Sequence, residues 1–196
     1  MRALFRDVCY DINRVFDFRT VGMTTPNRII FGCGAINQLG EEAASLAKGK
    51  ALLVSDEVLE KLGTMAEAKA KLEASGFEVS TFTGVEAEPH IETADALYEQ
   101  HVDKGFSIIV GLGGGSVMDM AKLTAQCVAN NIDPRKIVSG EAVAESRGLP
   151  MILAPTTSGT GSEVSSIFVL TDGEKKVFKN SPYYYSDISI IDPALT

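Results

Sequence analysis

The stretch Gly111-Leu-Gly-Gly-Gly-Ser-Val-Met-Asp119 follows the apolar run Ser107-Ile-Ile-Val110 and leads into a segment with helical spacing, residues 117–130. A short apolar run between turn signals is typical of a central strand in a parallel sheet. Three successive glycines let the backbone approach a ligand closely and adopt positive φ angles. We therefore predict a strand over residues 107–110, a turn over residues 111–115 and a helix behind it.

A helix that begins at this turn would direct unpaired N–H groups and the positive end of its dipole toward a bound phosphate. Ser116 adds one hydroxyl. The spacing matches neither common nucleotide fingerprint, because G-x-G-x-x-G needs a glycine at position 116 and a Walker A loop needs a lysine. We expect the turn to bind a diphosphate; the alternative is a tight connection that binds no ligand.

Strands and helices alternate along the rest of the chain. The predicted strands cover residues 28–31, 51–54, 77–82, 107–110, 151–154, 167–171 and 189–191. The predicted helices cover residues 35–48, 57–75, with Gly63 as a candidate interruption, 91–104 and 117–130. Asp172-Gly173 indicates a hairpin turn. This order predicts an α/β fold, a Rossmann-like and mainly parallel sheet with flanking helices.

A second polar loop, Ala154-Pro-Thr-Thr-Ser-Gly-Thr-Gly-Ser-Glu163, also follows a buried strand. Ligands of such sheets bind outside the carboxyl ends of the strands, so one ligand could contact both loops. The alternative is a solvent-exposed loop rich in serine and threonine. Because no G-x-S-x-G elbow is present, the sequence does not favour a serine hydrolase.

Asp56 follows the predicted strand over residues 51–54. An acid at this place can bind a ribose 2′-hydroxyl and would repel a 2′-phosphate. It can equally cap the helix that starts at Glu57. The sequence leaves both roles open.

Composition excludes several classes of protein. The chain has 196 residues, 18 Lys and Arg against 26 Asp and Glu, and a net charge of −8, which disfavours a nucleic-acid partner. No apolar run is long enough to span a membrane. Three widely spaced cysteines indicate a reducing compartment, so we expect a cytoplasmic protein. Residues 1–25 are expected to form an N-terminal extension, and residues 26–196 a dinucleotide-binding domain.

These motifs resemble the iron-containing, group III, alcohol dehydrogenases. The family's Gly-Gly-Gly-Ser-x-x-Asp loop corresponds to residues 113–119, and its Pro-Thr-Thr-x-Gly-Thr-x-Ser-Glu stretch to residues 155–163. Phe31-Gly-Cys-Gly34 and Asp192-Pro-Ala-Leu-Thr196 resemble two further family motifs. The unbroken threonine-rich stretch argues against a dehydroquinate synthase or a glycerol dehydrogenase.

The resemblance implies a set of NAD-binding residues. They are Gly113, Gly114, Gly115, Ser116 and Asp119 in the first loop; Thr156, Thr157 and Thr160 in the second; Asp56 at the ribose; and Val169 and Lys176, with Phe168, near the nicotinamide. It further implies a homo-oligomer, a dimer, that acts on a small alcohol or aldehyde.

In the family, one aspartate and three histidines hold iron or zinc in a helical second domain, beyond the Asp-Pro-x-Leu-Thr motif. The two histidines of this chain, His90 and His101, lie outside that motif, so we expect no metal site and no catalytic domain here. The resemblance implies the nucleotide-binding portion of an NAD-dependent, metal-dependent alcohol dehydrogenase, inactive by itself. The alternative is an NAD(P)-binding module without catalysis.

Overall fold

A computed structural model describes residues 24–196. The extension expected over residues 1–25 lies, but for its last two residues, outside this range. Within residues 24–196, no helix is long and apolar enough to cross a membrane.

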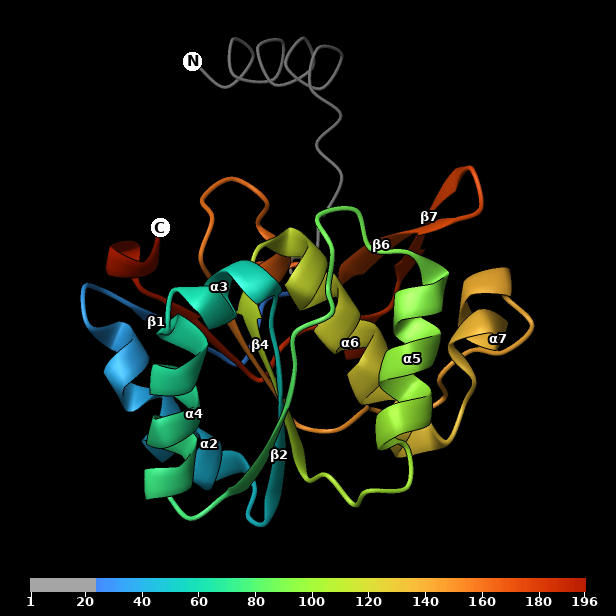
Figure 1. The fold of residues 1–196 in the computed structure, drawn as a ribbon. Helices are drawn as coiled ribbons and strands as arrows, with labels where there is room; N and C mark the ends of the chain where they lie inside the picture. Colours follow the sequence, from blue (N-terminus) through green and yellow to red (C-terminus); the bar gives the residue numbers. More distant parts are fainter. Residues whose placement is uncertain (1–23) are drawn as a thin grey trace, which may run out of the picture.

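Six parallel strands form the central sheet (Figure 1). They are β1 (Arg28–Phe31), β2 (Lys50–Val54), β3 (Glu78–Phe82), β4 (Ile108–Gly113), β5 (Met151–Pro155) and β8 (Ile188–Ile191). Their order across the sheet is β1-β8-β5-β4-β2-β3. The predicted parallel sheet is therefore confirmed.

The central strands are buried on both faces because alternate side chains enter two separate cores. Leu52, Ile109 and Leu153 belong to one hydrophobic cluster. Their chain neighbours Leu53 and Val110 belong to the other. This double burial explains why β2, β4 and β5 are continuous apolar runs without polar alternation.

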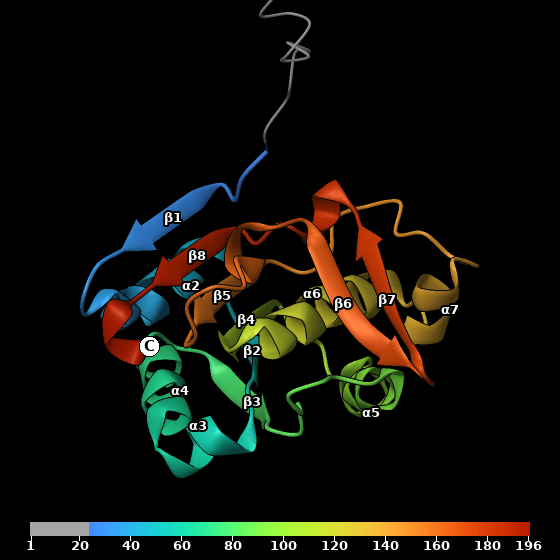
Figure 2. The same cartoon turned by 90° about the horizontal axis from the view of Figure 1, so that it is seen from above.

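Helices cover both faces of the sheet. On one side lie α2 (Leu39–Leu46), α3 (Glu57–Lys61) and α4 (Thr64–Ala74); on the other lie α5 (Ile91–His101), α6 (Gly115–Asn130) and α7 (Pro134–Ser139) (Figures 1 and 2). Short 3₁₀ turns are η1 (Ala35–Gln38), η2 (Ser162–Val164), η3 (Pro182–Tyr184) and η4 (Pro193–Leu195). Gly63 separates α3 from α4, as expected.

An antiparallel hairpin of β6 (Ile167–Asp172) and β7 (Lys175–Asn180) packs over α6, apart from the main sheet (Figure 2). The turn predicted at Asp172-Gly173 joins the two strands. Phe168 is fully buried and packs edge-on against Tyr184, with ring centroids 5.0 Å apart. The hairpin thereby extends the core on the α6 side of the sheet.

Several elements differ from the sequence predictions. The turn predicted over residues 111–115 is reduced to Gly114, because β4 continues to Gly113 and α6 already begins at Gly115. The helix predicted over residues 35–48 is a 3₁₀ turn followed by α2. Helix α7 was not predicted, although Asp133 caps it and Pro134 opens it, both standard start signals.

Candidate functional site

The direction of the chain reverses between β2 and β4. After β2 the chain moves outward to β3 and then returns to place β4 on the other side of β2. The helices that follow β2 and β4 consequently lie on opposite faces, which leaves a crevice at the carboxyl ends of these strands.

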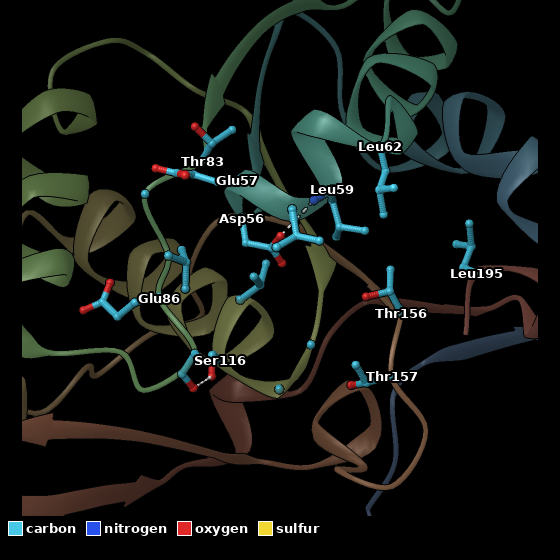
Figure 3. Close-up of a pocket in the computed structure, with 17 residues that line it drawn as sticks. Asp56, Glu57, Leu59, Leu62, Thr83, Glu86, Ser116, Thr156, Thr157 and Leu195 are labelled. Atoms are coloured by element: carbon cyan, nitrogen blue, oxygen red, sulfur yellow. Dashed lines mark hydrogen bonds between the residues drawn. The ribbon is translucent and has the colours of Figure 1, made fainter.

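A cleft of about 800 Å³ occupies this place, and we call it the switch-point cleft (Figure 3). Its walls come from the segments that follow five strands of the sheet. The lining residues include Asp56 after β2, Thr83 after β3, Gly114, Gly115 and Ser116 after β4, Thr156 and Thr157 after β5, and Leu195 after β8. Five of the predicted loop residues, Gly114, Gly115, Ser116, Thr156 and Thr157, therefore meet in one cleft, whereas Gly113, Asp119 and Thr160 do not line it.

Helix α6 starts at the base of the cleft without a side-chain cap. Gly114 is its N-cap residue and makes no capping hydrogen bond. The first turn of a helix has N–H groups without intrahelical partners, and they face the cleft through residues 115 and 116. A Cβ added at Gly114 would lie 3.5 Å from Oγ1 of Thr157, which is ordinary contact. The backbone at Gly114 is thus open to an anion.

The other glycines of this segment serve packing. A Cβ at Gly111 would lie 2.9 Å from Cβ of Ala121, and one at Gly113 would lie 2.6 Å from Cγ2 of Val117. Neither glycine lines the cleft. Their missing side chains let α6 lie close against β4, whereas Gly114 and Gly115 form the cleft surface.

Asp56 caps α3 and also lines the switch-point cleft. Its Oδ1 accepts a hydrogen bond of 2.9 Å from the Leu59 N–H, so the helix-cap role is real. Its second carboxylate oxygen has no protein partner among the hydrogen bonds of residues 24–196. The ribose role of Asp56 stays a prediction that the capping geometry permits.

Carboxylates, and no lysine or arginine, supply the charged side chains of the switch-point cleft in the described chain. They are Asp56, Glu57 and Glu86. Burial raises the pKa of Glu86, but hydrogen bonds from Thr93 and His90 outweigh it and hold that pKa below its usual value. A bound diphosphate would therefore depend on the backbone N–H groups and dipole of α6 and on neutral donors such as the hydroxyls of Thr156 and Thr157.

A second cleft of about 510 Å³ adjoins the first and shares Ala87, Gly115 and Ser116 with it. We call it the hairpin cleft because β6 and β7 form one wall. Besides Gly115 and Ser116, four further predicted site residues line it: Asp119, Thr160, Val169 and Lys176. Lys176 Nζ lies 3.3 Å from Oε1 of Glu88, and both side chains are exposed.

Phe168 does not reach the hairpin cleft. It points into the core, opposite to Val169 on the same strand, because successive side chains of a strand face opposite sides. The prediction that Phe168 borders the nicotinamide is therefore wrong.

The two histidines lie at opposite ends of α5. His90 is exposed and binds Glu86, and His101 is buried between Phe82 and Phe106. Among residues 24–196, no group of three or more His, Cys, Asp or Glu is placed to hold a metal ion. The described residues therefore do not fit an iron or zinc site.

Two residues at the hairpin cleft were not predicted from the sequence: Glu88, which lines it, and Lys122, which lies behind its wall. Glu88 lies in the connection between β3 and α5, whose position depends on the fold. A lysine that follows an apolar stretch of a helix commonly faces solvent. The side chain of Lys122 is instead fully buried. Only the strand that packs over α6 could have indicated this.

Comparison with known proteins identifies the family. A model of the iron-containing alcohol dehydrogenases matches residues 26–193. The chain belongs to this family. The predicted resemblance and its Rossmann-like fold are thereby confirmed.

Two curated proteins are similar to this chain in sequence. Long-chain-alcohol dehydrogenase 1 of Geobacillus thermodenitrificans is 36% identical over 177 residues, which are 86% of this chain and 45% of that protein. Sulfoacetaldehyde reductase of Bilophila wadsworthia is 35% identical over 176 residues, 88% of this chain and 45% of that protein. The chain thus spans about half the length of the curated relatives it matches.

A solved structure within the family has the same fold. Sulfoacetaldehyde reductase from Bifidobacterium kashiwanohense, in complex with NAD⁺, aligns with a TM-score of 0.79 and 27% identity. The alignment covers 91% of this chain and 47% of that one.

Proposed function

We propose that this chain is the NAD-binding portion of an alcohol dehydrogenase, which transfers a hydride between a small alcohol or aldehyde and the nicotinamide. One observation carries the proposal. The uncapped N-terminus of α6 opens into the switch-point cleft, with the threonine loop packed against it. The solved structure of a relative in complex with NAD⁺ supports the choice of ligand.

The chain's residues would bind and orient the dinucleotide. The N–H groups that follow Gly114 bind the diphosphate, and Thr157 lies beside them. Asp56 accepts from the adenosine ribose and disfavours a 2′-phosphate. Thr160, Val169 and Lys176 surround the nicotinamide half in the hairpin cleft. The cofactor supplies the hydride chemistry when bound, and the protein supplies its position.

Residues 24–196 contain no group of three or more side chains placed to hold a metal ion, and no step of this proposal passes through one. A small aldehyde as substrate agrees with the name of one curated relative, sulfoacetaldehyde reductase. The other relative is named for long-chain alcohols. Assembly as a dimer and a cytoplasmic location stay predictions of the sequence.

Calorimetric titration of residues 1–196 with NAD, NADP and ADP tests the proposal. We expect NAD and ADP to bind and NAD to bind more tightly than NADP. Absence of binding by both NAD and ADP would contradict the proposal.

An absorbance assay with a panel of primary alcohols and diols tests catalysis in the same chain, with and without added iron or zinc. We expect no turnover above background and no stoichiometric metal after loading. Turnover, or retained metal, would show that the chain carries a metal site. Binding without turnover in the longest natural form of the protein would favour the alternative, an NAD(P)-binding module.

A further inference from the structure

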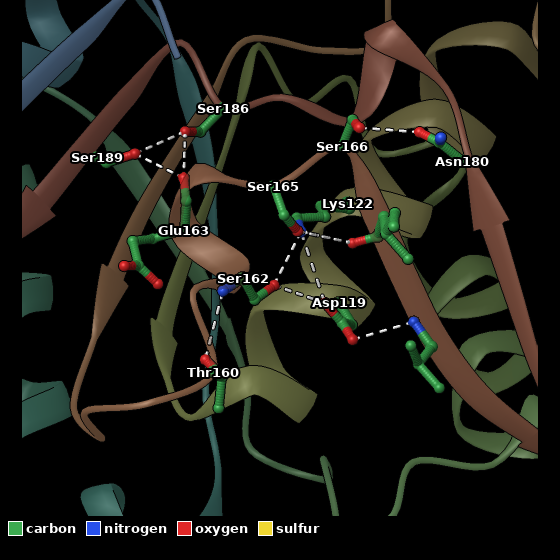
Figure 4. A network of polar contacts seen from close by, with 12 residues as sticks. Asp119, Lys122, Thr160, Ser162, Glu163, Ser165, Ser166, Asn180, Ser186 and Ser189 are labelled. Atoms are coloured by element: carbon green, nitrogen blue, oxygen red, sulfur yellow. Dashed lines mark hydrogen bonds and ion pairs between the residues drawn. The ribbon is translucent and has the colours of Figure 1, made fainter. Parts of the chain in front are cut away.

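Lys122 is a lysine whose side chain has no exposed surface at all. It lies on the second turn of α6, two turns from the glycine N-terminus. Its Nζ donates to Oγ of Ser162 at 2.8 Å, to Oγ of Ser165 at 3.3 Å and to the carbonyl oxygen of Ile167 at 2.7 Å (Figure 4). The three ammonium protons therefore each have an acceptor.

Asp119 completes this network one turn earlier on the same helix. Its Oδ1 accepts from Oγ of Ser162 at 2.6 Å, and its Oδ2 accepts from the Val169 N–H at 3.0 Å. The Lys122 Nζ lies 3.6 Å from Oδ1. Burial lowers the pKa of Lys122 to about 8 and raises that of Asp119, although each partially offsets the other's shift.

The network connects α6 with two neighbouring segments that lie at least forty residues later in the chain than Lys122. They are the end of the threonine loop at Ser162, and β6 at Ile167 and Val169. The Glu163 carbonyl, next in the chain, accepts from Ser186 and Ser189 and so ties the loop to the main sheet. Helix α6 and strand β6 are thereby held in one register by side-chain hydrogen bonds.

The acceptors of Lys122 form a wall of the hairpin cleft, whereas Lys122 lies behind it. Asp119, Ser162, Ser165, Ile167 and Val169 all line that cleft, and Lys122 does not. A buried ion pair is a poor source of net stability, because apolar side chains of the same volume often stabilise as well. The directional hydrogen bonds of Asp119 and Lys122 fix the wall of the hairpin cleft relative to the N-terminus of α6. Apolar packing alone would not specify this position.

We propose that Lys122 is a positioning residue that fixes the wall of the hairpin cleft through Ser162 and Ile167, and so sets the affinity for the nicotinamide half of the dinucleotide. The inference rests on the proposed function in one respect, that NAD extends across both clefts. Lys122 itself touches no ligand.

Titration of Lys122→Met with NAD and with ADP tests the inference, because ADP occupies only the switch-point cleft. Methionine matches the apolar stem of lysine as far as Cε and removes the three donors. We expect NAD to bind at least about tenfold more weakly and ADP to bind within about twofold of the original chain. The rise of NADH fluorescence on binding, which reports the environment of the nicotinamide, should also be lost.

Two serine variants keep the test decisive if Lys122→Met does not fold. Ser162→Ala should reproduce the selective loss of NAD affinity, and Ser162→Thr, which keeps the hydroxyl, should restore most of it. Ser166→Ala is the matched control, because its hydroxyl binds Asn180 on the exposed side of the same hairpin. It should change neither affinity.

The inference fails if the variants bind NAD as the original chain does, or if NAD and ADP affinities fall equally, as a general loss of structure would cause. Failure of the proposed function is a separate result, since the original chain would then bind neither NAD nor ADP.

Discussion

The Ser116 hydroxyl donates a hydrogen bond of 2.6 Å to the carbonyl oxygen of Ala87. The bond ties the start of α6 to residues 83–90, the connection that borders both clefts. The hydroxyl proton is therefore committed to the protein, and the oxygen that faces the cleft is an acceptor. A phosphate has no proton to offer it at neutral pH.

Ser116→Ala should consequently weaken NAD binding little, by less than about threefold. The N–H groups of α6 remain, and only the link to Ala87 is lost. Net loss of one hydrogen bond should lower the free energy of unfolding by about 1 kcal/mol. Calorimetric titration and urea denaturation measure the two effects; a tenfold loss of NAD affinity would instead show that the hydroxyl binds the diphosphate.

Gly114→Val should abolish NAD binding while leaving the fold intact. An added Cβ at Gly114 is only in ordinary contact with Thr157, so the new side chain fits but occupies the diphosphate position. We expect no measurable NAD affinity and a change of about 1 kcal/mol in unfolding free energy, since valine is a poor N-cap.

Gly111→Ala is the matched control for Gly114→Val, because it should lower stability and leave NAD affinity unchanged. Its Cβ would press on Ala121 and Leu153 at 2.9 Å, inside the core and away from the cleft. We expect overpacking to cost about 1–3 kcal/mol with NAD affinity unchanged in the folded fraction. For the first of these two variants, Gly114→Val, an NAD affinity equal to that of the original chain would refute the assignment of the switch-point cleft as the NAD site.

Asp56 can be tested with substitutions that separate its two roles. Asn and Ser are good N-cap residues, so Asp56→Asn should retain stability to within about 0.5 kcal/mol. It should narrow the preference for NAD over NADP, because the negative charge that repels a 2′-phosphate is gone. Asp56→Ala should narrow it too and also cost about 1 kcal/mol as the cap to Leu59 is lost. An unchanged preference in both variants would leave Asp56 as a helix cap only.

The burial of Lys122 predicts that the free energy of unfolding changes with pH in the alkaline range. Its pKa is about 8 in the folded chain, against an ordinary value of 10.5. Between these values the unfolded chain binds more protons than the folded one, so the free energy of unfolding rises with pH through this window. Below pH 8 the cost of burying the charged form is present in full.

Denaturation of the original chain and of Lys122→Met at several pH values between 7 and 10 checks this. The original chain should gain stability relative to the variant as the pH rises, because all other lysines cancel in the difference. A difference that does not vary with pH would show that the Lys122 pKa is ordinary.

Local sequence was sufficient for the elements that depend on local causes. The apolar runs of β2, β4 and β5 predict buried parallel strands, because burial on both faces removes polar alternation. Gly63 and the Asp172-Gly173 turn were likewise predictable from backbone preference. The end of β4 could not be predicted in this way. Gly111 and Gly113 belong to the strand because their missing side chains let α6 pack closely against it.

The sequence by itself determined that two loops follow buried parallel strands and that the first begins a helix. Parallel strands end at the same edge of a sheet, so residues 113–116 and 156–160 had to lie at one edge. Only the tertiary structure decided which partner each side chain meets there. Ser116 meets Ala87, Asp56 meets the N–H of Leu59, and Phe168 faces the core. Lys122 is buried because β6, more than forty residues later, packs over its helix. Such contacts depend on which segments the fold brings together, and no local pattern of residues encodes them.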